Sequence, residues 1–376
     1  MTAESTLHIL VMSADWQSAL ACIQSYGRKG HTVSIIARKV RHPNYASIFV
    51  KTTFYLNEKG IGERARELMQ LVERNAIDLV VPITDQDAVV VATVKQLFPD
   101  CDALVTSPLD TVSMTESRNK TTELCRSLNI DTPNTVFITH ADAAAEAAKL
   151  GYPCFLKLSG TFGSLGVFEI SGEAELGARL GQIPAHKEMQ LQEKVEGDLV
   201  DITGFAADGK LLESFAFSCD YIHSRAGTPA YSKRVYDDRL QGILSKITGR
   251  LRWTGGIDLD LLQRRDGTFV LLEINPRFSG TTVFALKVGI DIPICYVNAK
   301  LGIERSETFR PSRQKAERFV SLFEETHYLR GSGETGRLKS ASFRADDKWV
   351  DNAFWDDWRY SAALFEYVRG LLFRAQ

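Results

Sequence analysis

Strand-like and helix-like stretches alternate over the first 115 residues, and this alternation constrains the fold more than any other feature of the sequence. Short apolar runs lie at residues 7–12, 32–38 and 77–82. Stretches with helical periodicity lie at residues 15–30, 62–75 and 85–98. Strands that alternate with helices form a parallel sheet covered by helices, so we predict an α/β domain with a parallel sheet over residues 1–115. Its first turn, VMSADWQSAL, lacks the G-x-G-x-x-G pattern of dinucleotide sites.

Composition argues against several classes of protein. With 45 basic and 47 acidic residues the net charge is −2, which gives no reason to expect a nucleic acid or an anionic membrane as a partner. The six cysteines include no C-x-x-C pair, so we expect reduced thiols rather than a zinc site or a disulfide framework. The N-terminus has no basic leader, and no apolar stretch approaches the roughly 18 residues of a membrane span. We therefore expect a cytoplasmic protein.

The pattern changes after residue 115, where short strands and helices follow in α+β order. A helix over residues 115–130 carries Lys120 in its early turns. A strand that ends at Lys157 leads into a loop with glycines at positions 160, 163 and 166. Glycine lets backbone N–H groups approach phosphate oxygens closely, so this loop is a candidate phosphate cover, with a flexible hairpin as the alternative. It is not a Walker A loop, because no G-K-[ST] follows.

The stretch MQLQEKVEG, residues 189–197, is a predicted strand that runs into a turn. The end of a buried strand can offer backbone N–H and C=O groups to the edge of an adenine, and the contacts here would be Glu193, Lys194 and Val195. Read by itself, the stretch is equally a strand followed by a turn.

The stretch LLEINPRFSG places Glu273, Asn275 and Arg277 at alternate positions, so the three side chains share one face of a strand. The preceding strand carries Asp258 and Asp260 on one face, and the sequence RDG between the two strands predicts a hairpin. Carboxylate and amide oxygens on neighbouring strands are the ligands that Mg²⁺ prefers. An adjacent arginine could neutralise a phosphoryl group or orient a substrate carboxylate. The alternative is a half-buried edge strand with a polar outer face.

The order of these features resembles the ATP-grasp superfamily, in particular the carbamoyl-phosphate-synthetase-like carboxylate–amine ligases. The resemblance covers roughly residues 5–300 and rests on Lys120, Lys157, the glycine-rich loop SGTFGSLGV, the hinge QEKVEG, Asp260 and LLEINPRFSG. It implies that residues 1–115 are the α/β domain that precedes the ATP-grasp fold in that family. It further implies an α+β ATP-grasp domain over residues 116–305, with a mobile lid subdomain at about 126–192. Residues 306–376 would be a C-terminal extension.

The resemblance also implies roles for individual residues. Lys120 and Lys157 would hold ATP phosphates and act in catalysis together with Arg277, which would face the reacting carboxyl phosphate. The implied ATP contacts are Lys120, Lys157, Ser159, Gly160, Gly163, Ser164, Gly166, Glu193, Lys194, Val195 and Asp201. The implied ligands of Mg²⁺, or of Mn²⁺ in its place, are Asp260, Glu273 and Asn275. One position departs from the family: Leu199 stands where a glutamate commonly holds the ribose, and Asp201 or Asp198 would have to take that role.

The activity that the resemblance implies is ATP-dependent joining of a small-molecule carboxylate to an amine, through an acyl phosphate, with release of ADP and phosphate. The alternatives are an ATP-grasp phosphotransferase that phosphorylates a small molecule, and a nucleotide-binding module without turnover. Free-standing carbamoyl phosphate synthesis is disfavoured because the chain holds only one ATP-grasp unit. Biotin carboxylation is disfavoured because the chain is shorter than those enzymes usually are.

Two segments concern the partners of the chain. Residues 219–238 resemble the substrate-facing loop of the family, and Arg225, Lys233 and Arg234 there would hold an anionic substrate or else be solvated loop charges. The last segment carries Trp349, Trp355 and Trp358 and an amphipathic final helix, a pattern typical of internal packing or of a homodimer contact. We expect small-molecule carboxylate and amine substrates, and neither nucleic acid nor membrane as a partner.

Overall fold

The structure is a computed structural model that describes residues 6–38, 40–57, 60–158, 166–222, 229–303, 316–326 and 349–373. The chain divides into two compact units. The first comprises Met1–Val112, Ile202–Asp258 and Pro276–Gln376, and the second comprises Ser113–Asp201 and Leu259–Asn275. The domain limits given by the sequence, at about 115 and 305, stay a prediction.

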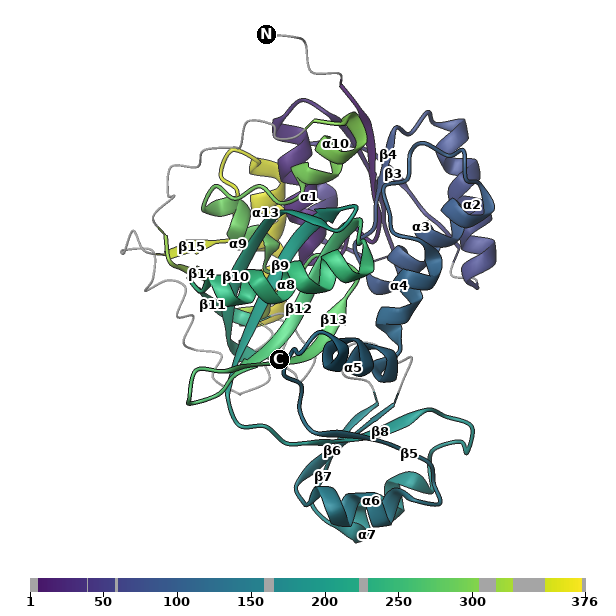
Figure 1. The fold of residues 1–376 in the computed structure, drawn as a ribbon. Helices are drawn as coiled ribbons and strands as arrows, with labels where there is room; N and C mark the ends of the chain where they lie inside the picture. The colour runs from purple at the N-terminus through teal and green to yellow at the C-terminus, as the bar shows by residue number, and fades with distance from the viewer. Residues whose placement is uncertain are drawn as a thin grey trace. The chain divides into compact units, whose positions relative to one another are not determined.

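A four-stranded parallel sheet with the strand order β3-β2-β1-β4 forms the N-terminal part of the first unit. Figure 1 labels two of its strands, β3 and β4. Its strands are β1 (His8–Val11), β2 (Thr32–Ile36), β3 (Val50–Phe54) and β4 (Leu79–Val81). Its helices are α1 (Gln17–Arg28), η1 (Pro43–Ala46), α2 (Ile61–Arg74) and α3 (Asp85–Leu97). The predicted α/β arrangement with a parallel sheet is therefore confirmed.

Three of the four strands, β1, β2 and β4, are mostly buried, which explains their apolar runs, whereas the edge strand β3 carries the exposed Lys51 and Thr52. Along β1, Ile9 and Val11 belong to one hydrophobic cluster, whereas Leu10 belongs to another that includes residues of α2 and α3. Successive side chains of a strand point to opposite faces, and a sheet with helices on both faces must bury each of them.

The larger sheet has seven strands in the order β13-β12-β9-β10-β11-β14-β15. The strands are β9 (Asp198–Ala207), β10 (Lys210–Ile222), β11 (Pro229–Arg234), β12 (Gly255–Gln263), β13 (Phe269–Asn275), β14 (Arg318–Val320) and β15 (Trp349–Asp351). The helices that follow them in the first unit are α8 (Asp238–Leu251), α9 (Thr282–Lys287), α10 (Ile294–Leu301) and α13 (Trp358–Phe373). The predicted hairpin is β12–β13, and it turns at Gly267, whose φ of +81° lies in the left-handed region that favours glycine.

The second unit contains a four-stranded antiparallel sheet with the order β5-β8-β6-β7. Its strands are β5 (Thr135–Ile138), β6 (Cys154–Leu158), β7 (Val167–Ile170) and β8 (Met189–Glu193). Helices α6 (Ala143–Leu150) and α7 (Glu173–Leu180) contribute to the hydrophobic cluster on one face of this sheet. Helix α5 (Arg118–Ser127) also belongs to this unit, and α4 (Leu109–Glu116) spans the division between the units.

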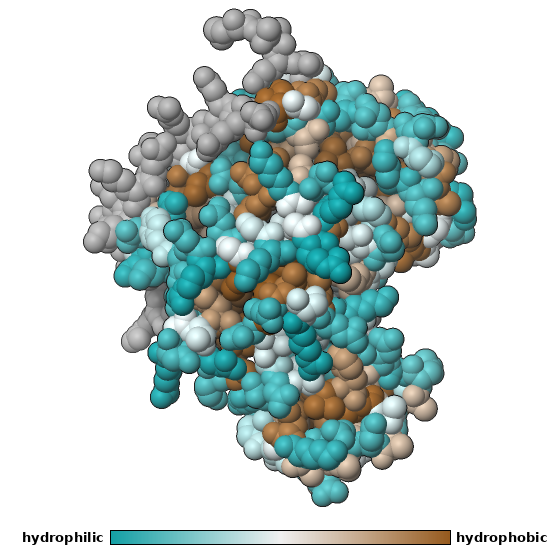
Figure 2. Space-filling model, viewed as in Figure 1, coloured by the Kyte–Doolittle hydropathy of each residue, from teal (hydrophilic) through white to brown (hydrophobic). Residues whose placement is uncertain are grey.

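The C-terminal segment adds two short strands to the larger sheet, and its tryptophans differ in their surroundings. Trp349 lies in β15 and packs edge-on against Tyr231, whereas Trp355 and Trp358 are exposed. On the face that Figure 2 shows, hydrophobic residues are interspersed among hydrophilic ones.

All six cysteines are free thiols. Within the described ranges, no helix combines the length and the hydrophobicity needed to cross a membrane.

Candidate active site

The hairpin β12–β13 positions the three predicted metal ligands. Glu273 and Asn275 alternate on β13, and the side-chain amide of Asn275 donates to Asp260 Oδ1 on β12 at 3.2 Å. The donor set of these residues consists of two carboxylates and one amide oxygen. Such hard oxygen donors fit Mg²⁺ or Mn²⁺ and do not favour a soft metal.

Arg118 is a residue of this site that the sequence analysis did not single out. It is the first residue of α5, its side chain is 9% exposed, and its Nη1 lies 3.1 Å from Glu273 Oε1. Its Nε also donates to the backbone oxygen of Leu158 at 3.3 Å, and Leu158 follows Lys157 at the end of β6. The guanidinium thus connects the helix, the hairpin and the strand that carries Lys157.

A helical signal in the sequence could have identified this arginine. Arg118, Thr121, Thr122 and Cys125 follow the spacing i, i+3, i+4, i+7 and form the buried face of α5. Lys120 lies off that face, and its side chain is exposed. The predicted role of Lys120 at the phosphates stays a prediction.

Lys157 is almost fully buried and electrostatically coupled to the same group. The residue is 8% exposed, and burial, followed by the Arg118 guanidinium, lowers its pKa to about 8. The carboxylates of Glu273 and Asp260 act in the opposite direction and raise the pKa. Two cations and two carboxylates therefore influence one another in this part of the second unit.

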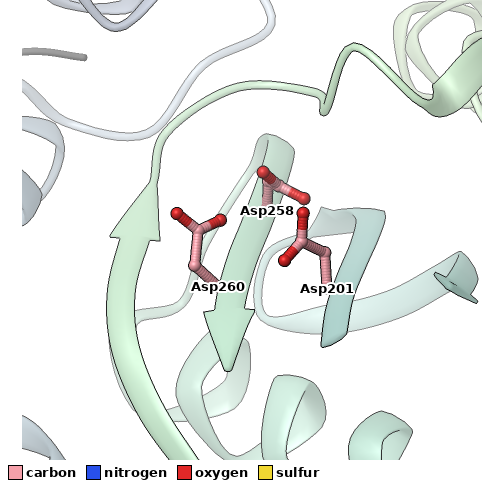
Figure 3. Close-up of side chains that lie close together, drawn as sticks. All are labelled: Asp201, Asp258 and Asp260. Atoms are coloured by element: carbon pink, nitrogen blue, oxygen red, sulfur yellow. The ribbon is translucent and has the colours of Figure 1, made fainter. Parts of the chain in front are cut away.

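Three carboxylates come together on adjacent strands of the larger sheet. Asp258 and Asp260 alternate on β12, and the neighbouring strand β9 carries Asp201. One oxygen from each side chain lies within 4.8 Å of the others, and Figure 3 shows the three groups. The family resemblance offered Asp201 or Asp198 for the ribose, and that role stays a prediction.

Arg277 lies between two acidic side chains within the first unit. Its Nη1 is 3.3 Å from Asp258 Oδ2, and its Nε is 3.5 Å from Asp85 Oδ1, at the start of α3. Its Nη1 also donates to the backbone oxygen of Phe278. These contacts fit a structural arginine that links the end of β13 to Asp258 and Asp85. They equally fit a catalytic arginine whose guanidinium is held in a fixed orientation.

The hinge after β8 is held by ion pairs within the second unit. Glu193 lies 3.5 Å from Arg264, and Lys194 lies 2.8 Å from Glu169. Gly197 passes so close to β12 that a Cβ there would lie 2.6 Å from the backbone oxygen of Gln263. Only glycine fits such an approach, which fixes the hinge beside the hairpin. Val195 is half-buried between these contacts.

The remaining predicted residues fall into two groups. Ser159, Gly160, Gly163, Ser164 and Arg225 lie outside the described residues. Gly166, at the end of the glycine-rich loop, has a φ of +79°. On β11, Lys233 is exposed, and Arg234 stacks on the rings of Phe215 and Tyr236. That stacking gives Arg234 a packing role, and the substrate role of both residues stays a prediction.

Comparison with known proteins connects this site to a family. The family model described as "ATP-grasp in the biosynthetic pathway with Ter operon" matches residues 225–320. The carbamoyl phosphate synthase large chain of Methanoculleus marisnigri is 27% identical over 256 residues, which cover 63% of this chain and 23% of that protein. The chain thus spans about a quarter of the length of this relative.

Solved structures show the fold. The N5-carboxyaminoimidazole synthetase of Staphylococcus aureus matches with a TM-score of 0.68 at 12% identity, covering 91% of this chain and 87% of that one. The L-amino acid ligase of Bacillus licheniformis matches with a TM-score of 0.60 at 15% identity, covering 80% and 75%. The biotin carboxylase domain dimer of Hydrogenobacter thermophilus 2-oxoglutarate carboxylase, in complex with MgADP and bicarbonate, matches with a TM-score of 0.65 at 13% identity, covering 81% and 72%. The predicted fold, a parallel α/β domain followed by an ATP-grasp fold, is therefore confirmed.

Proposed function

We propose that this chain, which belongs to the ATP-grasp superfamily, uses ATP to activate a small-molecule carboxylate and joins it to an amine, releasing ADP and phosphate. The observation that carries the proposal is the grouping of Arg118 and Lys157 with Glu273, whose hairpin also bears Asp260 and Asn275. Buried cations beside hard oxygen donors suit a magnesium-bound polyphosphate. The resemblance to an L-amino acid ligase, and to a carboxylase domain bound to MgADP, supports the same choice.

Each residue of the group has a role in this proposal. Lys157 and Arg118 hold phosphate oxygens of ATP. Arg118 is added to the predicted phosphate contact Lys120 because the side chain of Arg118 is buried, whereas that of Lys120 is exposed. Asp260, Glu273 and Asn275 hold Mg²⁺, which would spread the charge of the transferring phosphoryl group. Arg277 faces the carboxyl phosphate and offers a planar pair of donors to its oxygens.

The reaction balances without a protein nucleophile. A carboxylate oxygen attacks the γ-phosphorus, and the bond between that phosphorus and the oxygen bridging to the β-phosphate breaks, so that ADP leaves. The amine nitrogen then attacks the acyl carbon, the C–O bond to phosphate breaks, and the nitrogen loses a proton. The phosphate thus carries away one carboxylate oxygen. Lys157 and Arg118 offset the negative charge that gathers on the phosphoryl oxygens.

The pKa of Lys157 predicts how ATP use depends on pH. Below pH 8 the ammonium is charged and attracts phosphate, and above it the neutral amine does not. The ratio kcat/KM for ATP reports groups of the free enzyme, so we expect it to fall as the pH rises through about 8. Lys157→Arg keeps its charge at all these pH values and should lose this alkaline limb. Lys149→Arg, at an exposed lysine of α6, should keep the wild-type profile, and an unchanged limb in Lys157→Arg would contradict the assignment.

Release of ADP, measured with a matrix of carboxylates and amines and with the product mass recorded, tests the proposed activity. The proposal predicts that release requires one member of each class and that the product is an amide. A phosphorylated product that forms without an amine would favour the phosphotransferase. Nucleotide binding without release of ADP for any carboxylate–amine pair would favour the nucleotide-binding module without turnover. A cytoplasmic location stays a prediction from the sequence.

We also propose that the chain forms a homodimer, a state supported by the similar biotin carboxylase domain dimer. The exposed Trp355 and Trp358 give the first unit an aromatic surface that an interface could cover. Sedimentation at several protein concentrations should give twice the chain mass of 41.9 kDa. A mass of one chain at all concentrations would contradict the dimer.

A further inference from the structure

Gln190 lies directly opposite Lys157 in the smaller antiparallel sheet. Strands β6 and β8 pair with Lys157 facing Gln190. On β8 the alternate residues Met189 and Leu191 belong to the hydrophobic cluster of that sheet, so Gln190 points to the other face. Gln190 and Lys157 therefore share the face that carries the proposed phosphate site.

The side chain of Gln190 is buried with one polar atom unused. Gln190 is 3% exposed, and its Oε1 has no hydrogen-bond partner among the described residues. An acceptor buried in this way costs free energy unless something donates to it, and such atoms often serve a function. It lines a small pocket, partly open to solvent, together with Arg118 and Glu273.

Gln192 shows that this arrangement is specific to position 190. It lies two residues further along β8, on the same face and equally buried. Its side-chain amide donates to Thr135 Oγ1 on β5 at 3.1 Å, so it is committed to the sheet. The two glutamines thus form a matched pair that differ in whether the side chain is already bonded.

Lys157 carries a donor on the residue directly opposite Gln190 in the strand pair. Side chains directly opposite in an antiparallel pair have Cβ atoms about 4.5–5.5 Å apart, and both of these side chains are long. A lysine ammonium has three N–H donors. When it binds phosphate oxygens on one side, at least one N–H is left for another acceptor. Because Lys157 is buried, that acceptor has to come from the protein or from a trapped water.

We propose that Gln190 is a positioning residue: when nucleotide binds, its side-chain oxygen accepts a hydrogen bond from the Lys157 ammonium and holds that ammonium against the phosphates. This inference rests on the proposed function, because it takes Lys157 as a phosphate contact. It extends that function to a residue that acts through Lys157. The bond fixes the direction of the ammonium, and the affinity for nucleotide measures the effect.

A double-mutant cycle on the full-length chain tests the coupling, with MgADP as the probe and calorimetry as the measurement. Gln190→Met keeps the length of the side chain and removes the acceptor. We expect it to weaken MgADP binding about tenfold, the size expected of a hydrogen bond to a charged group. Lys157→Met should weaken binding at least as much, and the double variant should bind no more weakly than Lys157→Met alone.

The matched control uses Gln192→Met in the same cycle, where its effect should simply add to that of Lys157→Met. Melting temperatures of all variants distinguish the positioning role from a structural one. A structural role of Gln190 would lower the melting temperature without coupling to Lys157. Gln190→Leu serves as a second variant if Gln190→Met does not fold. Additive effects of Gln190→Met and Lys157→Met, or unchanged affinity in Gln190→Met, would overturn the inference alone. A wild-type chain that does not bind MgADP would overturn the proposed function as well.

Discussion

Glu273→Gln should lower turnover at limiting Mg²⁺ by at least roughly 100-fold, because removal of a residue that only supports a metal ligand already costs about 10- to 100-fold. The substitution keeps the size of the side chain and its hydrogen-bonding oxygen, and it removes the negative charge that the metal requires. Raising the Mg²⁺ concentration should recover part of the loss. The measurement is the rate of ADP formation as a function of Mg²⁺ concentration.

The fold should survive this substitution. The Glu273 side chain is 38% exposed, so solvent screens its ion pair with Arg118, and a glutamine keeps an oxygen that can accept from the guanidinium. Asp266→Asn is a suitable control, since it removes a carboxylate from the turn of the same hairpin, where Asp266 caps Thr268. That variant should keep the wild-type dependence on Mg²⁺. Unchanged ADP formation by Glu273→Gln at limiting Mg²⁺ would rule out Glu273 as a metal ligand.

Arg277→Ala should cut turnover by roughly 100-fold or more while leaving ATP affinity nearly intact, the loss typical of one donor to a transition state. Arg277→Lys should recover only part of the rate, because an ammonium cannot make two parallel hydrogen bonds to an acyl phosphate. The ion pairs with Asp258 and Asp85 give the structural alternative. An arginine that only ties these groups together predicts a lower melting temperature with near-normal kinetics.

Three measurements on the same variants separate the two roles of Arg277. They are ATP affinity, melting temperature and rate. Asp85→Asn is the matched control, because it removes one acidic partner and leaves the guanidinium in place. If Arg277 acts in the chemistry, Asp85→Asn should keep far more of the rate than Arg277→Ala. A large loss of stability in Arg277→Ala with a preserved rate would exclude the catalytic role.

The sequence predicted those parts of the fold whose signal is periodic. Strands β1, β2 and β4 of the N-terminal parallel sheet were predictable because both of their faces are buried, which leaves apolar runs such as that containing Ile9 and Leu10. Strand β3 was not predicted, because its sequence VKTTF is exposed at the sheet edge and shows no apolar run. The hairpin β12–β13 was predictable from its turn residues. Strands β14 and β15 were not predicted, because three residues show no periodicity and they form only by pairing with a strand distant in sequence.

The site was predictable only where a motif names its residues. LLEINPRFSG led to Glu273 and Asn275, and the structure joins Asn275 to Asp260. Motif order pointed to Lys120 on α5, whereas the buried face of that helix carries Arg118. The pairing of Arg118 with Glu273, and the lowered pKa of Lys157, depend on burial and on contacts between distant segments. The role of Gln190 depends in the same way on strand register.

Transfer of an oxygen atom tests the central claim most directly. Once the carboxylate is identified, it is supplied with oxygen-18 in its carboxyl group, and the released phosphate is analysed by mass spectrometry. Activation as an acyl phosphate predicts phosphate that carries one labelled oxygen and an amide that retains the other. Unlabelled phosphate released together with the amide would contradict the account.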